Sequence, residues 1–269
     1  MANELEFFNN RKMTDNQLEN ALIVMHNQLA RKQTKWNARE TKLFFSALSQ
    51  IKWRDDENWV RLKKSEIVSK LELDPRDTNK LRDMFQSVMK KSLIQFDGPT
   101  EEEWDDGFLI TRVKTTRNEV YVKFAEDYLP LLDKLESHFT MFQLENVVGF
   151  KSKYAIVLFQ DLKSRYNPKG IINHWQYRLD ELKYLFNIKD GEYVRNTGRQ
   201  KGTFDTANFK KKTLDRAVEE INKNTDQCRM YIEKVEVLKK YGMVVGYDIA
   251  FSLTDGNGFR CENQLELDL

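Results

Sequence analysis

The sequence predicts an α+β protein made of two tandem winged-helix domains and a flexible C-terminal tail. Three observations lead to this fold class. The chain of 269 residues is long enough for two domains. In each half, apolar residues recur first at helical spacing and then at alternate positions. The order helix, strand, helix, turn, helix, hairpin occurs twice, and it is typical of the winged helix-turn-helix. We place the domains at residues 1–136 and 137–254 and the tail at 255–269.

The first element predicted in the first half is a helix with a side-chain cap. Asn37 and Glu40 have the spacing of a capping box, and apolar residues then recur at helical intervals as far as Ile51. The elements expected after it are a strand over 59–62, a helix opened by Ser65 over 65–73, a third helix over 77–94, a hairpin over 107–124 and a connecting helix over 124–136.

The second half repeats this order. The expected elements are a buried helix over 151–166, an extended piece over 172–178, a helix over 179–188, a basic glycine-bearing loop over 189–203, one helix over 205–224 and a hairpin over 229–253. In that hairpin Val245, Tyr247, Ile249 and Phe251 alternate inward, and "LKKYG" forms the turn.

Composition points to a cytoplasmic protein that is neither exported nor inserted in a membrane. The chain has 44 Lys and Arg against 42 Asp and Glu, so the net charge of +2 conceals local segregation. The two cysteines, Cys228 and Cys261, are too few for a disulfide framework or a zinc site, and we expect inert thiols. No window approaches the roughly 18 apolar residues of a membrane span.

A search for catalytic parts predicts no enzyme. The histidines His26, His138 and His174 are scattered, without the His-x-His pair that would hold a metal. "GRQKGT" has the wrong spacing for a nucleotide phosphate loop. The acidic runs "RDDEN" and "EEEWDD" fall in expected loops, where solvated carboxylates are the ordinary explanation and a two-metal nuclease site is the alternative. We expect no catalytic residue, metal or cofactor.

The most informative charges lie early in the predicted helix 205–224. Lys210, Lys211 and Lys212 crowd its first turns and Arg216 follows, although the helix dipole favours acidic residues there. One interpretation is a solvated face. The other is an anionic partner such as DNA, because phosphates accept hydrogen bonds from lysines and from the N–H groups that begin a helix. Backbone contacts are also expected from the preceding loop and the hairpin turn, at Arg199, Lys201, Lys239 and Lys240.

Segments from most of the chain carry a resemblance to a known family. They are "VMHNQLARKQTKWNARETKLFFSALSQI" in the first half and, in the second, "FTMFQLENVVGFKSKYAIVLFQDLKSRY", "YRLDELKYLFNI", "FKKKTLDRAVEEINKNTD" and "VVGYDIAFSL". Together they resemble the initiator proteins of iteron-controlled, theta-replicating plasmids.

This resemblance implies two winged-helix domains related by pseudo-symmetry. The second would bind part of each directly repeated origin site, and the first would contact the adjacent groove in a monomer or form a dimer interface. The implied second-domain contacts are Lys153, Asn208, Lys210, Lys211, Lys212 and Arg216. The implied first-domain contacts are Arg76, Asn79, Lys80, Lys114 and Arg117.

The function that follows is non-covalent. An initiator bound to tandem repeats would bend and strain neighbouring A·T-rich DNA, where the host helicase or host initiator could be loaded. The family also implies that the dimer represses its own promoter or couples origins, which controls copy number. One alternative is a double winged-helix transcriptional regulator without a replication role. A scaffolding module that binds other proteins is another, and it predicts little salt-sensitive affinity for DNA.

The chain ends with "QLELDL", in which Leu265, Leu267 and Leu269 share one face of an extended strand. With Gln264 they resemble the short peptide by which bacterial replication proteins dock on the DNA polymerase sliding clamp. Apolar pockets would take the leucines, and the glutamine amide would form hydrogen bonds at the pocket rim. The alternative is that these residues add a strand to the second domain or fray.

Overall fold

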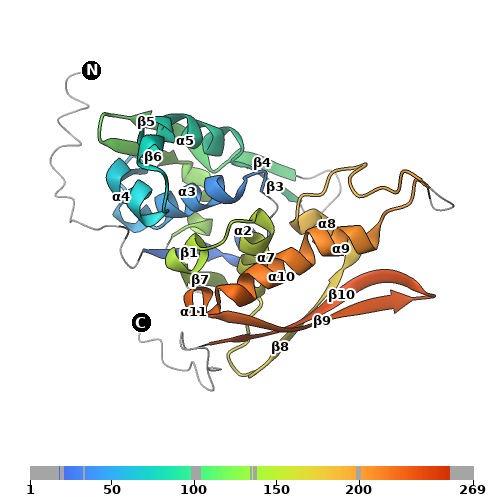
Figure 1. Cartoon of the computed structure of the whole chain (residues 1–269). Coiled ribbons are helices and arrows are strands. Elements are labelled where there is room, and N and C mark those ends of the chain that lie inside the picture. Colours follow the sequence, from blue (N-terminus) through green and yellow to red (C-terminus); the bar gives the residue numbers. More distant parts are fainter. Residues whose placement is uncertain are drawn as a thin grey trace.

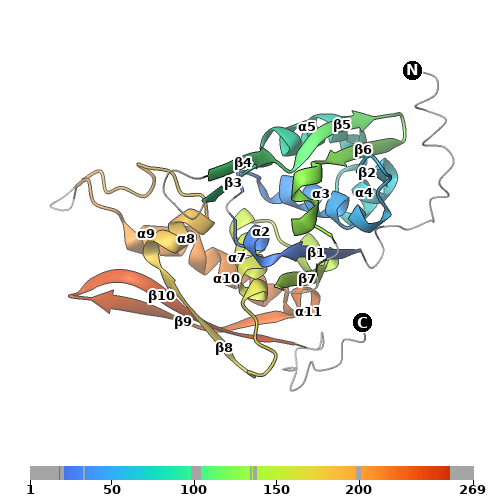
Figure 2. The same ribbon diagram turned by 180° about the vertical axis from the view of Figure 1, so that it is seen from behind.

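The computed structural model describes residues 18, 21–32, 34–97, 104–133, 135, 138–197 and 201–254. Figure 1 shows the first half, coloured blue to green, above the second half, coloured yellow to red, and Figure 2 shows the same arrangement from behind. In the ranges just given, no helix has both the length and the apolar character needed to cross a bilayer.

The first half alternates short helices and strands. Its elements are β1 (Leu22–His26), α2 (Asn27–Ala30), α3 (Ala38–Leu48), η1 (Ile51–Trp53), β2 (Trp59–Lys63), α4 (Lys64–Lys70), η2 (Pro75–Lys80), α5 (Leu81–Lys90), β3 (Leu93–Asp97), β4 (Trp104–Phe108), β5 (Ile110–Thr115), β6 (Glu119–Phe124) and η3 (Glu126–Leu131).

The second half follows a similar order. Its elements are β7 (Phe139–Gln143), α6 (Glu145–Val148), α7 (Lys153–Ser164), β8 (Asn173–Arg178), α8 (Leu179–Leu185), α9 (Thr206–Lys212), α10 (Leu214–Lys223), α11 (Thr225–Cys228), β9 (Met230–Lys240) and β10 (Met243–Leu253).

The two halves share one topology. In the first, the three-stranded sheet has the order β2–β6–β5, and in the second the order is β8–β10–β9. In both sheets the strand that follows the first long helix pairs with the last strand of the wing hairpin. All pairings are antiparallel. The prediction of an α+β chain with two tandem winged-helix domains is therefore confirmed.

Several first-half elements differ from the prediction. The capping box of Asn37 and Glu40 is present, but α4 begins at Lys64 without a side-chain cap from Ser65. The predicted third helix is split into η2 and α5 and ends at Lys90. The expected connecting helix is the short 3₁₀ segment η3, where Pro130 removes a backbone N–H donor.

The first half also contains a strand that the sequence pattern did not predict. The acidic run "EEEWDD" was expected in a loop, but Asp105 and Asp106 lie in β4, which pairs with β3. Gln95 Nε2 donates to Asp106 Oδ2 over 2.8 Å, and Tyr128 Oη donates to Asp105 Oδ1 over 3.2 Å. These contacts offset the low strand propensity of aspartate.

In the second half, the predicted helix over 205–224 is broken at Thr213. The backbone there has φ −119° and ψ −73°, which separates α9 from α10. The Thr213 hydroxyl donates to the Phe209 carbonyl over 2.7 Å, a bond back to residue i−4 that bends helices. In the hairpin, Tyr247, Ile249 and Phe251 are buried as predicted. Val245 is exposed, because the register shifts between Val244 and Gly246 and turns it outward.

The halves share one core rather than burying two separate ones. Strand β1 from the first half pairs with β7 from the second over five residues. The ring of Phe142 in β7 lies 5.3 Å from Phe45 of α3 and 5.5 Å from Phe159 of α7, both near perpendicular. Edge-to-face pairs of this kind add to the free energy gained by burial alone. The buried apolar residues of both halves form a single cluster.

Polar contacts reinforce this joint. Arg31, at the end of α2, donates from Nε to Ser164 Oγ and from Nη2 to the Ser164 carbonyl, each over 2.8 Å. It thereby satisfies a carbonyl at the end of α7. Gln160 Nε2 donates to the Ala30 carbonyl over 2.8 Å. Lys42 of α3 donates to the carbonyl of Val148, and burial lowers the pKa of its ammonium.

Glu40 joins α3 to α5 and generates a stability prediction. The carboxylate accepts from the Asn37 N–H over 2.8 Å, from Ser87 over 2.6 Å and from Lys91 over 2.6 Å. Burial opposes ionisation, but these hydrogen bonds prevail and lower the pKa of the Glu40 carboxyl. The stabilisation is complete above the ordinary carboxyl pKa and is lost as pH falls through the lowered folded-state value.

We therefore expect Glu40→Gln to reduce the free energy of unfolding at neutral pH by about 1–3 kcal/mol, because the bonds from Asn37, Ser87 and Lys91 lose the charge of their acceptor. Urea denaturation measures this change. The matched control is Glu57→Gln. The Glu57 side chain is 72% exposed, and its ion pair with Lys123 is long, at 3.7 Å, so the loss of its charge should have little effect. Equal midpoints for the two variants would contradict the proposed role of Glu40.

Candidate nucleic-acid interface

Helix α9 holds the lysine cluster, but not at the end that the sequence pattern predicted. Because the helix breaks at Thr213, Lys210, Lys211 and Lys212 occupy the last turn of α9, where the dipole favours positive charge. Asp205 caps the first turn and accepts from the Asn208 N–H over 3.1 Å. The predicted conflict with the dipole is therefore wrong, and this N–H is already bonded within the protein.

The lysines nevertheless form a cationic surface. Lys210 is half-buried and paired with Asp215 of α10. Lys211 and Lys212 are exposed, and neither has a carboxylate partner among the residues that the structure describes. Arg216 is exposed at the start of α10. Two uncompensated lysines beside an exposed arginine attract an anionic ligand such as a phosphate backbone.

A hollow beside these lysines brings together residues from separate elements. Its lining includes Tyr154 at the start of α7, Tyr193 in the loop after α8, Asn208 of α9 and Lys212. Burial and a hydrogen bond with Tyr193 raise the pKa of the Tyr154 hydroxyl, which stays protonated. The half-buried Lys153 lies with its Nζ 5.0 Å from the Tyr154 ring centroid, and burial lowers the pKa of its ammonium.

The hollow groups two of the implied DNA contacts, Asn208 and Lys212, with two tyrosines. A third implied contact, Lys153, lies against the ring of Tyr154, although it is 59 positions before Lys212 in the sequence. Sequence reasoning missed Tyr154 and Tyr193, whose phenol groups support this surface. The available signal was an aromatic residue within two positions of a basic one, in "SKYA" and "YVRN".

The wing lies at the same end of the second half as α9, as Figures 1 and 2 both show. Lys239 and Lys240, predicted in the hairpin turn, are exposed as the last two residues of β9, directly before the turn. Lys201 is exposed in the loop before α9. Arg199, predicted in the same loop, lies outside the described residues. The structure thus gathers the lysines of the loop, α9 and wing at one end.

The first half presents an equivalent but weaker surface. Arg76, Asn79 and Lys80 are exposed in η2, which holds the position in the topology that α9 holds in the second half. Arg76 lies 2.6 Å from Asp74, and Lys80 lies 3.0 Å from Asp77. Each cation is therefore balanced by an acidic neighbour. In the first-half wing, Arg117 is exposed at the turn and Lys114 is half-buried in β5.

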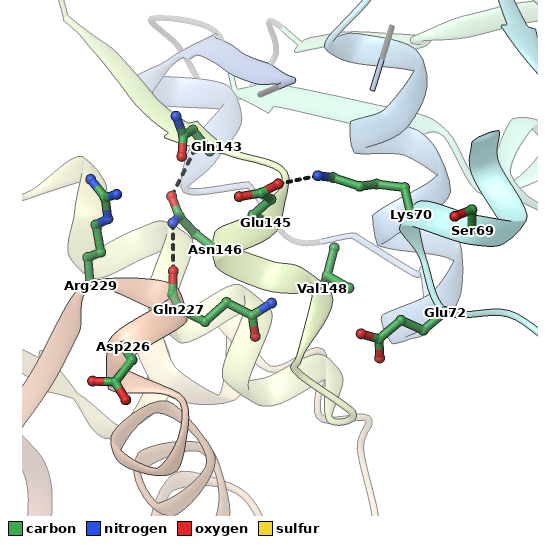
Figure 3. A pocket seen from close by; sticks show the side chains of 10 residues that line it. All are labelled: Ser69, Lys70, Glu72, Gln143, Glu145, Asn146, Val148, Asp226, Gln227 and Arg229. Carbon is green, nitrogen blue, oxygen red and sulfur yellow. Dashed lines mark hydrogen bonds and ion pairs between the residues drawn. The ribbon is translucent and has the colours of Figure 1, made fainter. Parts of the chain in front are cut away.

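The polar hollow between the halves is shown in Figure 3. The Lys70 ammonium of α4 pairs there with the Glu145 carboxylate of α6. The amide of Asn146 accepts from the Gln143 N–H over 2.9 Å and donates to the Gln227 carbonyl over 2.8 Å, so it joins β7 to α11. These contacts connect neighbouring elements and indicate a structural role for the hollow.

The histidines and the described cysteine lie apart from the lysine surface of α9. The rings of His26 and His138, predicted as scattered, lie 6.5 Å apart across the start of the β1–β7 pair. Even so, the described residues contain no group of three or more His, Cys, Asp or Glu side chains placed to hold a metal ion. Cys228 is buried, and burial raises the pKa of its thiol to about 11. Both features favour the predicted inert thiol, and Cys261 lies outside the described residues.

Comparisons with known proteins agree with the repeated topology. The family model described as "Initiator Replication protein, WH1" matches residues 22–163, and the model described as "Initiator Rep protein, WH2" matches residues 178–251. No curated protein sequence gives a significant match.

Comparison with solved structures gives two further matches. The Pi initiator protein, crystallised in complex with iteron DNA, is 17% identical with a TM-score of 0.66, over 88% of this chain and 99% of that chain. Domains 2 and 3 of RctB are 12% identical with a TM-score of 0.48, over 84% of this chain and 82% of that chain. At these identities the first likeness shows the fold alone.

The exposed lysines of α9 generate a binding prediction. We expect Lys211→Ala with Lys212→Ala to weaken binding to duplex DNA without unfolding the protein, because neither side chain is buried. The slope of log K against log salt concentration should flatten by about 0.9 for each phosphate that the variant no longer neutralises. The control is Lys90→Ala with Lys169→Ala, which removes the same charge from two exposed positions outside this surface. Equal slopes for the two pairs would count against the assignment.

Proposed function

The chain belongs to the initiator replication protein family, and from this premise we propose that it is a plasmid replication initiator that binds directly repeated double-stranded DNA at an origin. The observation that carries the proposal is the unpaired lysine surface at the α9 end of the second winged helix. The similar Pi initiator was crystallised with iteron DNA, which supports the same class of ligand.

The charge difference between the halves suggests a division of labour. The second half, with its uncompensated lysines, would be the main reader of the repeat, entering one major groove with α9 and α10. The first half would make auxiliary contacts in the next groove through η2, where each cation has an acidic neighbour. Two successive major grooves on one face span about 20 base pairs. The dimer that the resemblance implies would instead use the first half for self-association.

The mechanism that we propose has no covalent step. Several initiators on tandem repeats would bend the duplex, and the strain would fall on flexible A·T-rich steps beside the repeats. The opened segment would receive the host replicative helicase or host initiator in the cytoplasm. The dimeric form would limit copy number by repressing the promoter or coupling origins.

The second candidate is a transcriptional regulator that uses the same surface without opening DNA. We therefore expect direct repeats of roughly 20 base pairs next to an A·T-rich segment near the coding gene. With the protein bound to these repeats on a supercoiled plasmid, permanganate should modify thymines in the A·T-rich segment. Protection of the repeats without thymine reactivity would favour the regulator. DNA binding that does not depend on salt, or no DNA binding at all, would favour a scaffold that binds other proteins.

The C-terminal peptide supports a finer proposal, that the protein docks on the sliding clamp. Gln264, Leu265, Leu267 and Leu269 lie outside the described residues, so the support is the sequence pattern alone. In an extended segment the three leucines would share one face and fill apolar pockets, while Glu266 and Asp268 would point to solvent. An initiator that recruits clamp-bound polymerase would start synthesis at the opened origin.

Titration of the host clamp tests this proposal. We expect binding by the full chain and loss of binding by Gln264→Ala with Leu267→Ala and by a chain that ends at Asn263. The control Glu266→Ala with Asp268→Ala alters only the outward positions and should bind as the wild type does. Affinity for repeat DNA should be the same in all four. The docking role would be refuted if the truncated chain bound the clamp, or if no form of the protein, including the full chain, bound it.

A further inference from the structure

The tip of the second-half wing carries side chains that the fold does not use. Tyr241 is 89% exposed and Met243 is 66% exposed, the two highest values among large apolar side chains in the described part of the chain. Val237 and Val245, each 41% exposed, are further apolar side chains of the same hairpin. Burial of exposed apolar surface lowers the free energy, so the tip is suited to bind a ligand that removes it from water.

The turn itself is a poor site for a tyrosine. Strands β9 and β10 are joined by Tyr241 and Gly242, whose φ angles of 50° and 77° are both left-handed. Such two-residue turns favour Asn-Gly, because asparagine and glycine tolerate this region and bulky residues do not. Tyr241 therefore stabilises neither the turn nor the core. Strain of this kind at an exposed position points to a functional role.

The charges around the tip identify its ligand. Lys239 and Lys240 precede the turn and are exposed, and Lys240 Nζ lies 5.7 Å from the Tyr241 ring centroid. An apolar tip flanked by cations matches the minor groove of DNA, where apolar wedges enter between base pairs and cations hold the phosphates on either side.

The hairpin is also long enough to reach a groove. On β9, Val237 pairs with the buried Tyr247, and four further residues lead to Tyr241. At about 3.3 Å per residue, the tip extends roughly 13 Å beyond this pair. The minor groove is about 7.5 Å deep. Figures 1 and 2 show the tip of the β9–β10 hairpin projecting beyond the helices of the second half.

The first-half wing provides an internal comparison. Strands β5 and β6 have six residues each, against eleven each for β9 and β10. Their turn consists of Thr116, Arg117 and Asn118, which are all polar. The two wings hold equivalent places in the topology, but only the second combines length with an apolar tip.

We propose that Tyr241 and Met243 form a wedge that enters the minor groove beside the major groove occupied by α9 and α10, and unstacks one base step there. This inference rests on the proposed function and deepens it, because it assigns the distortion of the duplex to named side chains. The wedge kinks the repeat DNA, and kinks in successive repeats add to the strain on the neighbouring A·T-rich segment.

The test uses the full chain and repeat DNA. In a series of DNA duplexes, 2-aminopurine replaces one adenine at a time in the segment whose minor groove lies next to the α9 site. We expect wild-type protein to raise the fluorescence at one step, because unstacking relieves quenching. Tyr241→Asn with Met243→Thr should abolish this rise while lowering affinity by less than about tenfold, since the major-groove contacts remain. Asparagine also suits the left-handed turn, so the variant should fold.

Tyr231→Thr is the matched control, because Tyr231 is 41% exposed at the base of the same hairpin. It should leave the fluorescence rise intact. An unchanged rise in the Tyr241→Asn, Met243→Thr variant, or none in the wild type despite tight repeat binding, would overturn the wedge and leave the proposed function standing. Failure of the wild type to bind repeats at all would overturn the proposed function, and the wedge with it.

Discussion

The pairing of β1 with β7 determines how the two winged helices are placed relative to each other. It joins the start of the first half to the start of the second, and Ile23, Met25 and Phe142 bury its apolar face. The rings of Phe45, Phe142 and Phe159 continue the contact from α3 to α7. Because one core runs through both halves, the surfaces at η2 and α9 keep a fixed separation, as the proposed reading of two successive grooves would require.

This joint also limits how the protein can be divided. A chain that begins near Phe139 retains β7 but loses its partner β1 and exposes Phe142. It would also lose the bonds that Arg31 and Lys42 make to Ser164 and Val148. The boundary predicted near Glu136 falls outside the described residues, so the contribution of each half is better tested by substitutions in the full chain.

Local patterns were sufficient to predict the repeated helices and wing hairpins, whereas the misses arose from side-chain bonds and strand pairings that hydrophobic periodicity does not show. The capping box at Asn37 and the alternation around Tyr247 are visible within a few residues. The break at Thr213 depends on a hydroxyl bond back to Phe209, and strand β4 depends on partners in β3 and η3. The β1–β7 pair joins segments more than 100 positions apart, which periodicity cannot reveal.

The clustering of the α9 lysines was visible in the sequence, whereas their position in the helix was not. Lys211 and Lys212 are exposed, Lys210 is half-buried and paired with Asp215, and the helix break removes the dipole conflict. In the first half, Asp74 and Asp77 accompany Arg76 and Lys80 in the sequence, and their ion pairs weaken that surface. The apolar wing tip at Tyr241 was predicted only as a turn, because exposure and backbone angle are not visible in a sequence pattern.

Hydroxyl-radical footprinting of the full chain on a single repeat tests the central claim, that the joint presents two winged helices to one face of the duplex. The account predicts two protected zones separated by about 10 base pairs, the stronger at the second-half site. A single protected zone of one helical turn, or two zones on opposite faces of the duplex, would contradict it.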